Sequence, residues 1–405
     1  MDTMSWHQPQ ESEIRSCTSY SSQQSLPLIP SLNYVHPEGL QPVSANIYHH
    51  CMTTLKGHSS YVSSLALAGN LLFSGSSDKQ IRSWKCDGLS FSHDEQYISD
   101  NVVANGKGAV KAMVILSDKL FTAHQDHKIR VWKIDSDENH NGKYQRLAKL
   151  PTLSDRAYNL LIPSSHVQIR RHKKSTWVHH VDTVSALALS KDGNILYSVS
   201  WDRSLKVWRT SDFKCLESVA NAHDDAINAV ESSSDGSVIT GSADRKIKVW
   251  RKHPGEKKHS LVGTLEKHNS GINALATSID GSVLFSGASD RSIVVWEKDG
   301  DNMTVVGALR GHTKAILCLA VVAELVCSGS ADKTIRIWQA YDRSYSCLAV
   351  LEGHSGPVKC LAASISHTNP SNSICLSSYL VYSGSLDCDI KVWQVCIPHF
   401  LDLFN

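Results

Sequence analysis

The residues with the most obvious chemical potential are Ser, His and Asp side chains that recur together along the chain. Seven times, an Asp precedes a Trp by six positions, and a Ser or Thr precedes that Asp by four positions. These sets are Ser74, Asp78 and Trp84; Thr122, Asp126 and Trp132; Ser198, Asp202 and Trp208; Thr240, Asp244 and Trp250; Ser286, Asp290 and Trp296; Ser328, Asp332 and Trp338; and Ser383, Asp387 and Trp393. Six units also carry a His four positions before a Val or Ile, namely His58, His180, His223, His268, His312 and His354. The second unit has Gly106 there, so we expect this unit to be held together least tightly.

A Ser, a His and an Asp in hydrogen-bond order also describe the catalytic triad of a hydrolase. A catalytic site has to occur once, whereas this set occurs six times at constant spacing and always with a Trp. A structural role explains the pattern better, because a buried indole N–H needs an acceptor, a hydroxyl accepts that bond, and an imidazole joins the hydroxyl to the Asp. The chain has no GxSxG, HExxH or Gly-rich phosphate-binding sequence. We therefore expect no enzyme activity, no catalytic residues, no metal site and no cofactor.

Short apolar runs with strand-forming residues, separated by turn residues, surround these sets. In the first unit the runs are Val62 to Leu67, Leu71 to Ser74, and Ile81 to Trp84. Consecutive Trp residues of the repeat lie 42 to 76 positions apart. Units of about 40–45 residues with four strands each are typical of β-propeller blades. The sequence therefore predicts an all-β, seven-bladed β-propeller.

The pattern of Gly-His, Ser/Thr-x-x-x-Asp and Trp resembles the WD40 repeat, and the resemblance extends from Ile47 to Val395. The stretches SVSWDRSLKVWRTSDFKCLESV and LRGHTKAILCLAVV are similar, more narrowly, to plant WD40 proteins of the JINGUBANG type. The WD40 resemblance implies that the repeated Asp, His, Ser/Thr and Trp side chains form a hydrogen-bonded chain within each blade.

The composition divides the chain into a tail, a propeller and a second, shorter tail. Residues 1–46 are rich in Ser, Gln and Pro, so we expect a disordered tail that adds nothing to stability. Residues 47–396 would form the propeller, with the segment Ile47 to Leu55 completing the seventh blade. An insert at about 134–176 lies between blades 2 and 3, and contains a helical turn that we expect Ser154 to cap. Residues 397–405 form the C-terminal tail.

Charge and cysteine content restrict the class of protein. The chain has 41 Lys and Arg against 39 Asp and Glu, a formal charge of +2, so nucleic acid is not a favoured partner. Its 11 cysteines include no CxxC pair, and the sequence shows neither a signal segment nor a membrane span. We expect a monomer without membrane contact that is located in the cytoplasm, with the nucleus left open as an additional location. A basic cluster of Arg170, Arg171, Lys173 and Lys174 is either a nuclear-import or nucleic-acid patch or, as we favour, a solvated loop.

Two sets of positions should lie on the top face, defined as the end of each blade that carries the repeated Asp. They are the residue before that Asp and the residue before the first strand of each unit, and Tyr61, Trp201 and Leu386 stand out by size. Trp201 is either an anchor for a partner or a lid over Arg203 by a cation–π contact. Basic residues that follow the Asp would form a broken ring, to which Lys314 adds: Lys79, Arg203, Arg245, Arg291 and Lys333.

These observations favour a non-enzymatic scaffold or adaptor that binds partner proteins or peptides through Tyr61, Trp201, Arg203, Lys314 and Leu386. The JINGUBANG-type resemblance implies a regulatory or signalling role in plants. One alternative is a substrate receptor of a cullin-RING ubiquitin ligase, which we disfavour because none of the seven Trp residues starts a W-D-x-R sequence. Another is a nucleic-acid-associated regulator that uses the basic cluster of the insert.

Overall fold

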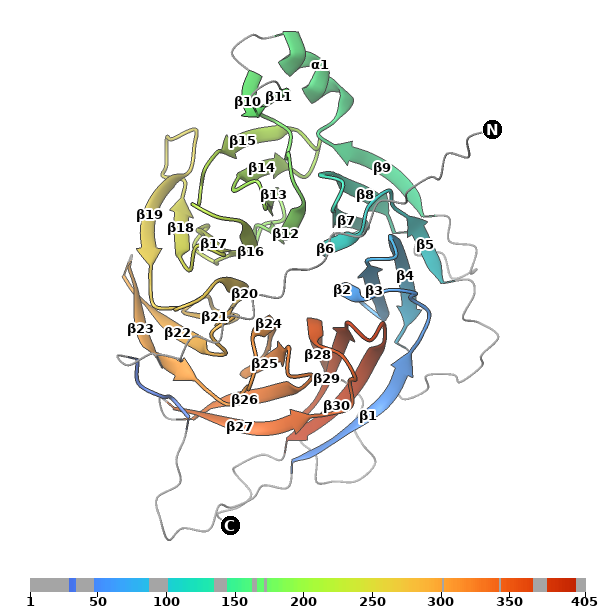
Figure 1. The fold of residues 1–405 in the computed structure, drawn as a ribbon, viewed down its shortest axis with the longest axis vertical. Coiled ribbons are helices and arrows are strands. Elements are labelled where there is room, and N and C mark those ends of the chain that lie inside the picture. Colours follow the sequence, from blue (N-terminus) through green and yellow to red (C-terminus); the bar gives the residue numbers. More distant parts are fainter. Residues whose placement is uncertain are drawn as a thin grey trace, which may run out of the picture.

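Seven antiparallel four-stranded sheets stand in a ring around a central axis (Figure 1). This computed structural model describes residues 29–33, 47–86, 101–134, 144–161, 166–170, 173–300, 302–341, 344–366 and 377–397. The arrangement confirms the prediction of a seven-bladed propeller. Its helix α1 (Leu153–Leu161) has nine residues, and no helix in the described ranges is long and apolar enough to cross a membrane.

Each blade runs from a first strand at the central axis to a fourth strand at the rim. Blade 1 has β2 (Val62–Ala68), β3 (Leu71–Ser76), β4 (Gln80–Lys85) and β5 (Val102–Asn105); blade 2 has β6 (Val110–Leu116), β7 (Lys119–His124), β8 (Ile129–Lys133) and β9 (Gln145–Leu150); blade 3 has β12 (Val184–Leu189), β13 (Ile195–Ser200), β14 (Leu205–Arg209) and β15 (Cys215–Val219); blade 4 has β16 (Ile227–Ser232), β17 (Val238–Ser242), β18 (Ile247–Arg251) and β19 (Ser260–Leu265). Blade 5 has β20 (Ile272–Thr277), β21 (Val283–Ala288), β22 (Ile293–Asp299) and β23 (Asn302–Leu309); blade 6 has β24 (Ile316–Val322), β25 (Leu325–Ser330), β26 (Ile335–Tyr341) and β27 (Ser344–Leu351); blade 7 has β28 (Val358–Ser366), β29 (Ser377–Ser385), β30 (Ile390–Ile397) and, at its rim, β1 (Tyr48–Leu55).

The ring closes where the N-terminal strand β1 pairs with β30, as expected. The antiparallel register runs from Tyr48 opposite Cys396 to Leu55 opposite Ile390, with an irregularity between Cys51 and Thr53. Figure 1 shows the blue β1 alongside the red β30. Blade 7 is therefore built from both ends of the propeller, with β1 covering the outer edge of β30.

The expectation of a wholly disordered N-terminal tail is wrong for residues 29–33. Ile29 and Leu32 are buried, and the backbone of this segment is hydrogen-bonded to blades 5 and 6. The expectation that the tail adds nothing to stability loses its basis for the same reason. The average composition of the Ser- and Gln-rich tail concealed a short apolar stretch. Ile29 and Leu32 of this stretch pack against the propeller. The remaining residues of the predicted tail lie outside the described residues.

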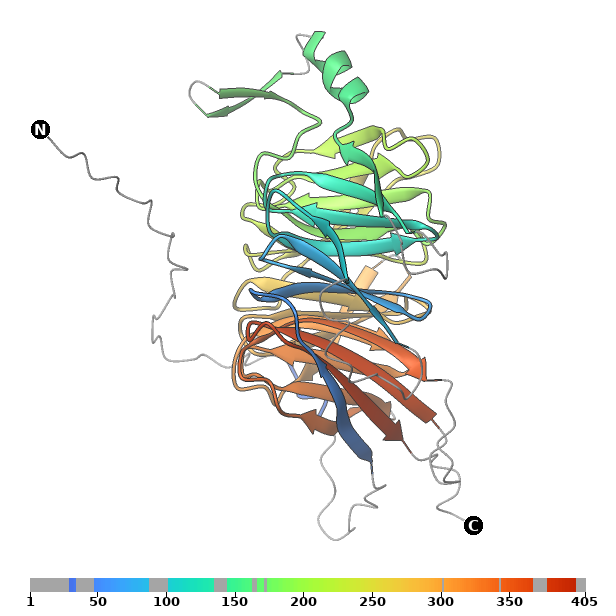
Figure 2. The same ribbon diagram turned by 90° about the vertical axis from the view of Figure 1, so that its right-hand side faces the viewer.

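The insert between blades 2 and 3 contains more regular structure than a solvated loop. Its helix α1 is capped by Thr152, whose hydroxyl accepts the Asp155 N–H at 3.2 Å, and not by Ser154, whose hydroxyl bonds to that of Thr152 at 2.9 Å. Strands β10 (His166–Arg170) and β11 (Lys173–Thr176) form a hairpin that places Arg170 opposite Lys173 and Lys174 opposite Gln168. Figure 2 shows α1 and this hairpin standing off from the ring. Arg171 lies outside the described residues.

A buried chain of hydrogen bonds ties three parts of each blade together. In blade 1, the Trp84 indole N–H donates to Ser74 Oγ at 2.8 Å, His58 Nε2 lies 2.8 Å from the same oxygen, and His58 Nδ1 lies 2.8 Å from Asp78 Oδ2. Asp78 also accepts the backbone N–H groups of Ser59 and Gln80. The same chain, with side-chain distances of 2.8–3.2 Å, occurs in blades 3 to 7. Each chain fixes the loop before the first strand against the turn between the second and third strands.

Blade 2 supplies the histidine from a different position. His124, at the end of β7, places Nε2 2.8 Å from Thr122 Oγ1, which accepts the Trp132 indole N–H at 2.9 Å. Gly106 makes room for this ring, because a Cβ at Gly106 would lie 3.0 Å from His124 Cε1. Asp126 pairs instead with Arg130. The histidine link is therefore present, and the reason for expecting a loosely held second unit no longer applies.

The first prediction concerns the hydroxyl at the centre of this chain. Ser74→Ala removes the acceptor of the Trp84 N–H and the partner of His58 in a fully buried position, whereas Ser59→Ala changes an exposed residue of the same blade. A buried donor without a partner costs about 1–3 kcal/mol. Ser74→Ala should lower the free energy of unfolding by that amount in chemical denaturation. Equal stability of the two variants would show that the chain of hydrogen bonds does not hold the blade.

The second prediction concerns pH. Burial, and then the charge of Arg130, lower the pKa of His124 to about 4. An unfolded His titrates near 6.5, so the unfolded chain binds a proton that the folded chain refuses. The stabilisation that comes from keeping His124 neutral is therefore complete above about pH 6.5, and it is lost as the pH falls towards 4. Burial also lowers the pKa values of His180, His223 and His354.

Thermal melts at pH 7.5 and 5.0 test this linkage. His124→Gln should show a smaller drop in Tm between the two pH values than the unaltered chain, because one of the titrating groups is gone. His49→Gln, at an exposed position of β1, should leave the drop unchanged. If His124→Gln and His49→Gln behave alike, His124 does not link protonation to folding.

Candidate functional site

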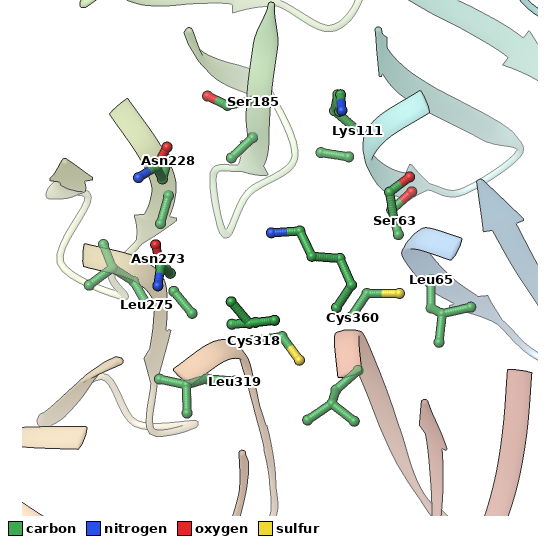
Figure 3. Close-up of a pocket in the computed structure, with 18 of the residues that line it drawn as sticks. Ser63, Leu65, Lys111, Ser185, Asn228, Asn273, Leu275, Cys318, Leu319 and Cys360 are labelled. Atoms are coloured by element: carbon green, nitrogen blue, oxygen red, sulfur yellow. The ribbon is translucent and has the colours of Figure 1, made fainter. Parts of the chain in front are cut away.

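The first strands of all seven blades enclose a cavity of about 340 Å³ on the propeller axis. Figure 3 shows side chains from these strands pointing into it. Most of the lining is small or apolar, such as Ala112, Leu275 and Leu319. Tyr61 and Trp201 line the same cavity, and they come from the loop before β2 and the turn between β13 and β14. The cavity is therefore open to the top face, and we call this opening the channel mouth.

Several polar groups of the lining hold neighbouring blades together. Each donates to a backbone carbonyl of the next blade: Ser63 to Val110, Ser185 to Ile227, Asn228 to Ile272, Asn273 to Ile316, Cys318 to Val358 and Cys360 to Val62. These donors are engaged in fixing the ring, so they are poorly placed to hold a ligand. Hydrogen bonds to a ligand would therefore come from other residues of the cavity lining.

Two lysines carry the charge of the channel mouth. Lys111 and Lys359 are the charged residues among the described lining of the cavity. Lys111 Nζ donates to the Tyr61 hydroxyl at 3.0 Å, and it lies 5.5 Å from the centre of the Tyr61 ring and 5.7 Å from the centre of the Trp201 ring. Within the described part of the chain, no carboxylate forms an ion pair with either lysine. The channel mouth is therefore positively charged and flanked by two aromatic rings.

Trp201 is 42% exposed at the tip of the turn between β13 and β14. Its backbone N–H donates to the Thr183 carbonyl at 3.1 Å, which fixes the turn against the loop before β12. One prediction from the sequence was that the Trp201 ring covers Arg203. Among the described residues, the cation that lies over the Trp201 ring is instead Lys111, which belongs to another blade. Lys111 thus orients the indole across the boundary between blades 2 and 3 while much of the ring remains in solvent.

The electrostatics of the channel mouth act on Tyr61. Burial raises the pKa of the Tyr61 phenol, but the hydrogen bond from Lys111, the hydrogen bond with Ser77 and the charges of Lys111 and Lys359 together lower it below its ordinary value. A lowered phenol pKa is the response of an acidic group to nearby uncompensated cations. The same field would favour the carboxylates of an incoming ligand.

The other predicted site residues lie on the top face outside the cavity. Arg203 and Lys314 are exposed, and Leu386 is 40% exposed. The sequence predicted that Arg203, Lys314 and Leu386 would form one site with Tyr61 and Trp201. Of these five residues, the structure places only Tyr61 and Trp201 at the channel mouth. The basic residues after the repeated Asp all adopt positive φ, with values of 67° to 75° at Lys79, Arg203, Arg245, Arg291 and Lys333. His127 and Cys388 take the same position in blades 2 and 7.

Sequence reasoning missed Lys111 and Lys359, which carry the charge of the site. Both immediately follow the first apolar residue of a first strand, Val110 and Val358. The other blades have Ser63, Ser185, Asn228, Asn273 and Leu317 at this position. Comparing the units at this position would have found the two cations. Among the described residues, no group of three or more His, Cys, Asp or Glu side chains is placed to hold a metal ion.

The third prediction tests the coupling between Lys111 and Tyr61. Lys111→Met removes a cation and a hydrogen bond but leaves Tyr61 half-buried, so the pKa of Tyr61 should rise. Titration followed by NMR of tyrosine labelled at ¹³Cζ would measure the change, with Tyr61→Phe for assignment. Lys314→Met, which removes an equal charge elsewhere on the top face, should leave the pKa of Tyr61 unchanged. A similar shift in both variants would mean that the effect comes from overall charge.

Comparison with known proteins agrees with the blade structure. The sequence model of the family described as "WD domain, G-beta repeat" (WD40) matches residues 49–85, 171–209, 213–251, 259–297, 303–339 and 345–394, well over half of the chain. The matched segments leave out residues 86–170, which contain blade 2. That blade is the one in which His124 takes over from the usual histidine position.

Three relatives illustrate how far the similarity extends. Protein tipD of Dictyostelium discoideum is 22% identical over 185 residues, which are 44% of this chain and 28% of tipD. Small ribosomal subunit protein RACK1 of Drosophila melanogaster is 34% identical over 85 residues, 20% of this chain and 26% of RACK1. Myosin heavy chain kinase C of D. discoideum is 29% identical over 146 residues, 35% of this chain and 17% of the kinase. The chain thus spans less than a third of the length of these relatives.

The segments that match the family model coincide with blades of the propeller. On that ground the chain belongs to the WD40-repeat family.

Proposed function

We propose that this chain is a non-enzymatic scaffold that binds an acidic segment of a partner protein at the channel mouth. The observation that carries the proposal is the cluster of Tyr61, Lys111 and Trp201, with Lys359 beside it in the same cavity. WD40 propellers are typically protein-interaction scaffolds, and this cluster is the part of the top face that combines exposed aromatic surface with uncompensated positive charge.

Physical arguments support an acidic peptide as the ligand. An exposed Trp with a fixed orientation loses little conformational entropy on binding, and such residues are frequent hot spots. A carboxylate that enters the cavity would receive charge-assisted hydrogen bonds from the Lys111 and Lys359 ammonium groups. Because the first strands of the blades surround the cavity, these interactions would be screened less than on an open surface. The exposed Arg203 and Lys314 would steer an acidic segment towards the mouth.

The finer functional assignment rests on resemblance. The similarity to JINGUBANG-type proteins supports a regulatory or signalling role in plants. We further propose that the chain acts as a monomer in the cytoplasm, with the nucleus as an additional location. Enzymatic activity has no support from the described residues, and the matched region is only 17% of myosin heavy chain kinase C. Substrate reception for a cullin-RING ligase is less well supported because no repeat carries W-D-x-R. A nucleic-acid role would depend on the β10–β11 hairpin, and the formal charge of +2 argues against it.

The fourth prediction tests the channel mouth by quantitative affinity purification from plant extract. Trp201→Ala and Lys111→Glu should each reduce the recovery of the same partner by tenfold or more, since tenfold corresponds to about 1.4 kcal/mol of binding free energy. Recovered partners should share an acidic segment, and binding should weaken with added salt.

Two control variants make the result specific. Lys258→Glu makes the same charge change as Lys111→Glu. Lys258 lies in the connection between β18 and β19, at the end of blade 4 that is opposite the top face. Tyr48→Ala removes an aromatic ring that is 61% exposed on the rim. Both controls should retain the partner, and all four variants should melt like the unaltered chain. Recovery of the same partners by Trp201→Ala, Lys111→Glu and the controls would refute the proposal.

A further inference from the structure

Residues 29–33 occupy a site at the rim of the propeller, far along the chain from the blades they touch. The site is formed by Gly307, Ala308 and Arg310 at the end of β23 and by Tyr345 in β27, and we call it the rim site. Figure 1 shows the short blue segment beside β23 and β27. These strands are the outermost strands of blades 5 and 6, so each has one edge without a partner in its own sheet.

The bound segment uses its backbone to bridge these two edges. Ala308 N–H donates to the Pro30 carbonyl at 2.9 Å, and Leu32 N–H donates to the Ala308 carbonyl at 3.0 Å. On the other side, Tyr345 N–H donates to the Leu32 carbonyl at 2.8 Å. Both bridges are parallel, one to each blade. This is the hydrogen-bonding mode by which extended peptides add to exposed sheet edges.

Three side chains of the segment give the rim site its selectivity. Ile29 is 6% exposed and packs in the cluster of Ala308 and Trp296, and Leu32 is 9% exposed and packs in the cluster of Phe285 and Tyr345. The side chain of Asn33 makes two hydrogen bonds to the backbone of Arg310. Its Nδ2 donates to the Arg310 carbonyl at 2.5 Å, and its Oδ1 accepts the Arg310 N–H at 2.9 Å. Ser31, by contrast, is exposed. The pattern read by side chains is therefore Ile-x-x-Leu-Asn, because Pro30 is exposed and contributes only its backbone carbonyl.

A glycine in β23 makes the site possible. A Cβ at Gly307 would overlap Leu32 Cγ and lie 2.8 Å from the Pro30 carbonyl oxygen. Gly263 has the equivalent register in blade 4, since it is opposite Val249 as Gly307 is opposite Val295. A Cβ at Gly263 would meet only Val249 Cβ, at 4.0 Å. The close approach of a peptide backbone is thus a property of the boundary between blades 5 and 6.

We propose that the rim site is a second docking site, separate from the channel mouth, for an extended segment of a partner protein with the pattern Ile-x-x-Leu-Asn. Residues 29–33 are its built-in competitor. Vacating the site leaves the ring intact, because the propeller closes through β1 and β30. The segment is covalently tethered to β1 through residues 34–46, and a short tether gives an effective concentration on the order of millimolar. A partner therefore binds when its affinity or local concentration exceeds that of the tethered segment.

The fifth prediction uses a fluorescent peptide with the sequence of residues 25–35, SLPLIPSLNYV, and the full chain. The double variant Ile29→Asp/Leu32→Asp removes both apolar anchors of the internal competitor. Fluorescence anisotropy should show that this variant binds the peptide at least tenfold more tightly than the unaltered chain. Adding Gly307→Val should abolish binding, whereas adding Gly263→Val should preserve it. A peptide in which the residues equivalent to Leu32 and Asn33 are Asp and Ala should not bind.

Several outcomes would overturn the proposal. One is equal peptide binding by the double variant and the unaltered chain, and another is equal loss of binding with Gly307→Val and Gly263→Val. Light scattering that shows a dimer of the unaltered chain, lost in the double variant, would mean that copies of the chain exchange tails. If the double variant melts abnormally, Leu32→Ala replaces it in the same assay. Trp201→Ala should leave peptide binding unchanged, so the test is independent of the channel mouth.

Discussion

The whole structure depends on the need of a buried indole N–H for an acceptor. In each blade that need is met by a hydroxyl, which in turn engages an imidazole, and in six blades the imidazole reaches a carboxylate. Since each partner comes from a different part of the blade, satisfying one polar group fixes three segments at once. The top-face loops are consequently the ends of a rigid network, which is why short turns can present Trp201 and Arg203 in fixed positions.

The centre of the ring follows the same logic. Polar side chains of the first strands join six of the seven blades to the next one, among them Ser63 of blade 1 and Cys360 of blade 7. Lys111 and Lys359 depart from that role, so positive charge collects where the cavity meets the top face. The proposed binding site thus lies where blades depart from the repeat, because the repeated positions already hold the ring together.

Periodicity made the fold predictable, and its exceptions mark the limits of sequence reasoning. Seven equal sets of Ser/Thr, Asp and Trp, together with the strand-forming segment before Lys56, were sufficient to predict seven blades closed by an N-terminal strand. His124 escaped because its ring reaches Thr122 from within a strand, at a spacing that no other unit uses. Residues 29–33 escaped because their partners lie about 275 positions away, which local composition cannot reveal. Trp201 was found by its size, whereas Lys111 stands out only when the residue after the first apolar position of each first strand is compared between units.

The pairing of β1 with β30 also determines the order in which the molecule is completed on the ribosome. Strand β1 is synthesised before every other strand of the ring, and its partner β30 is synthesised after them. At roughly 5–20 residues per second, synthesis of the chain between them takes about 20–70 seconds. Throughout that interval the backbone groups of β1 that later pair with β30 have no native partner, so closure of the ring is a late, long-range event. The newborn chain therefore has an unpaired strand edge to protect from aggregation until β30 has been synthesised.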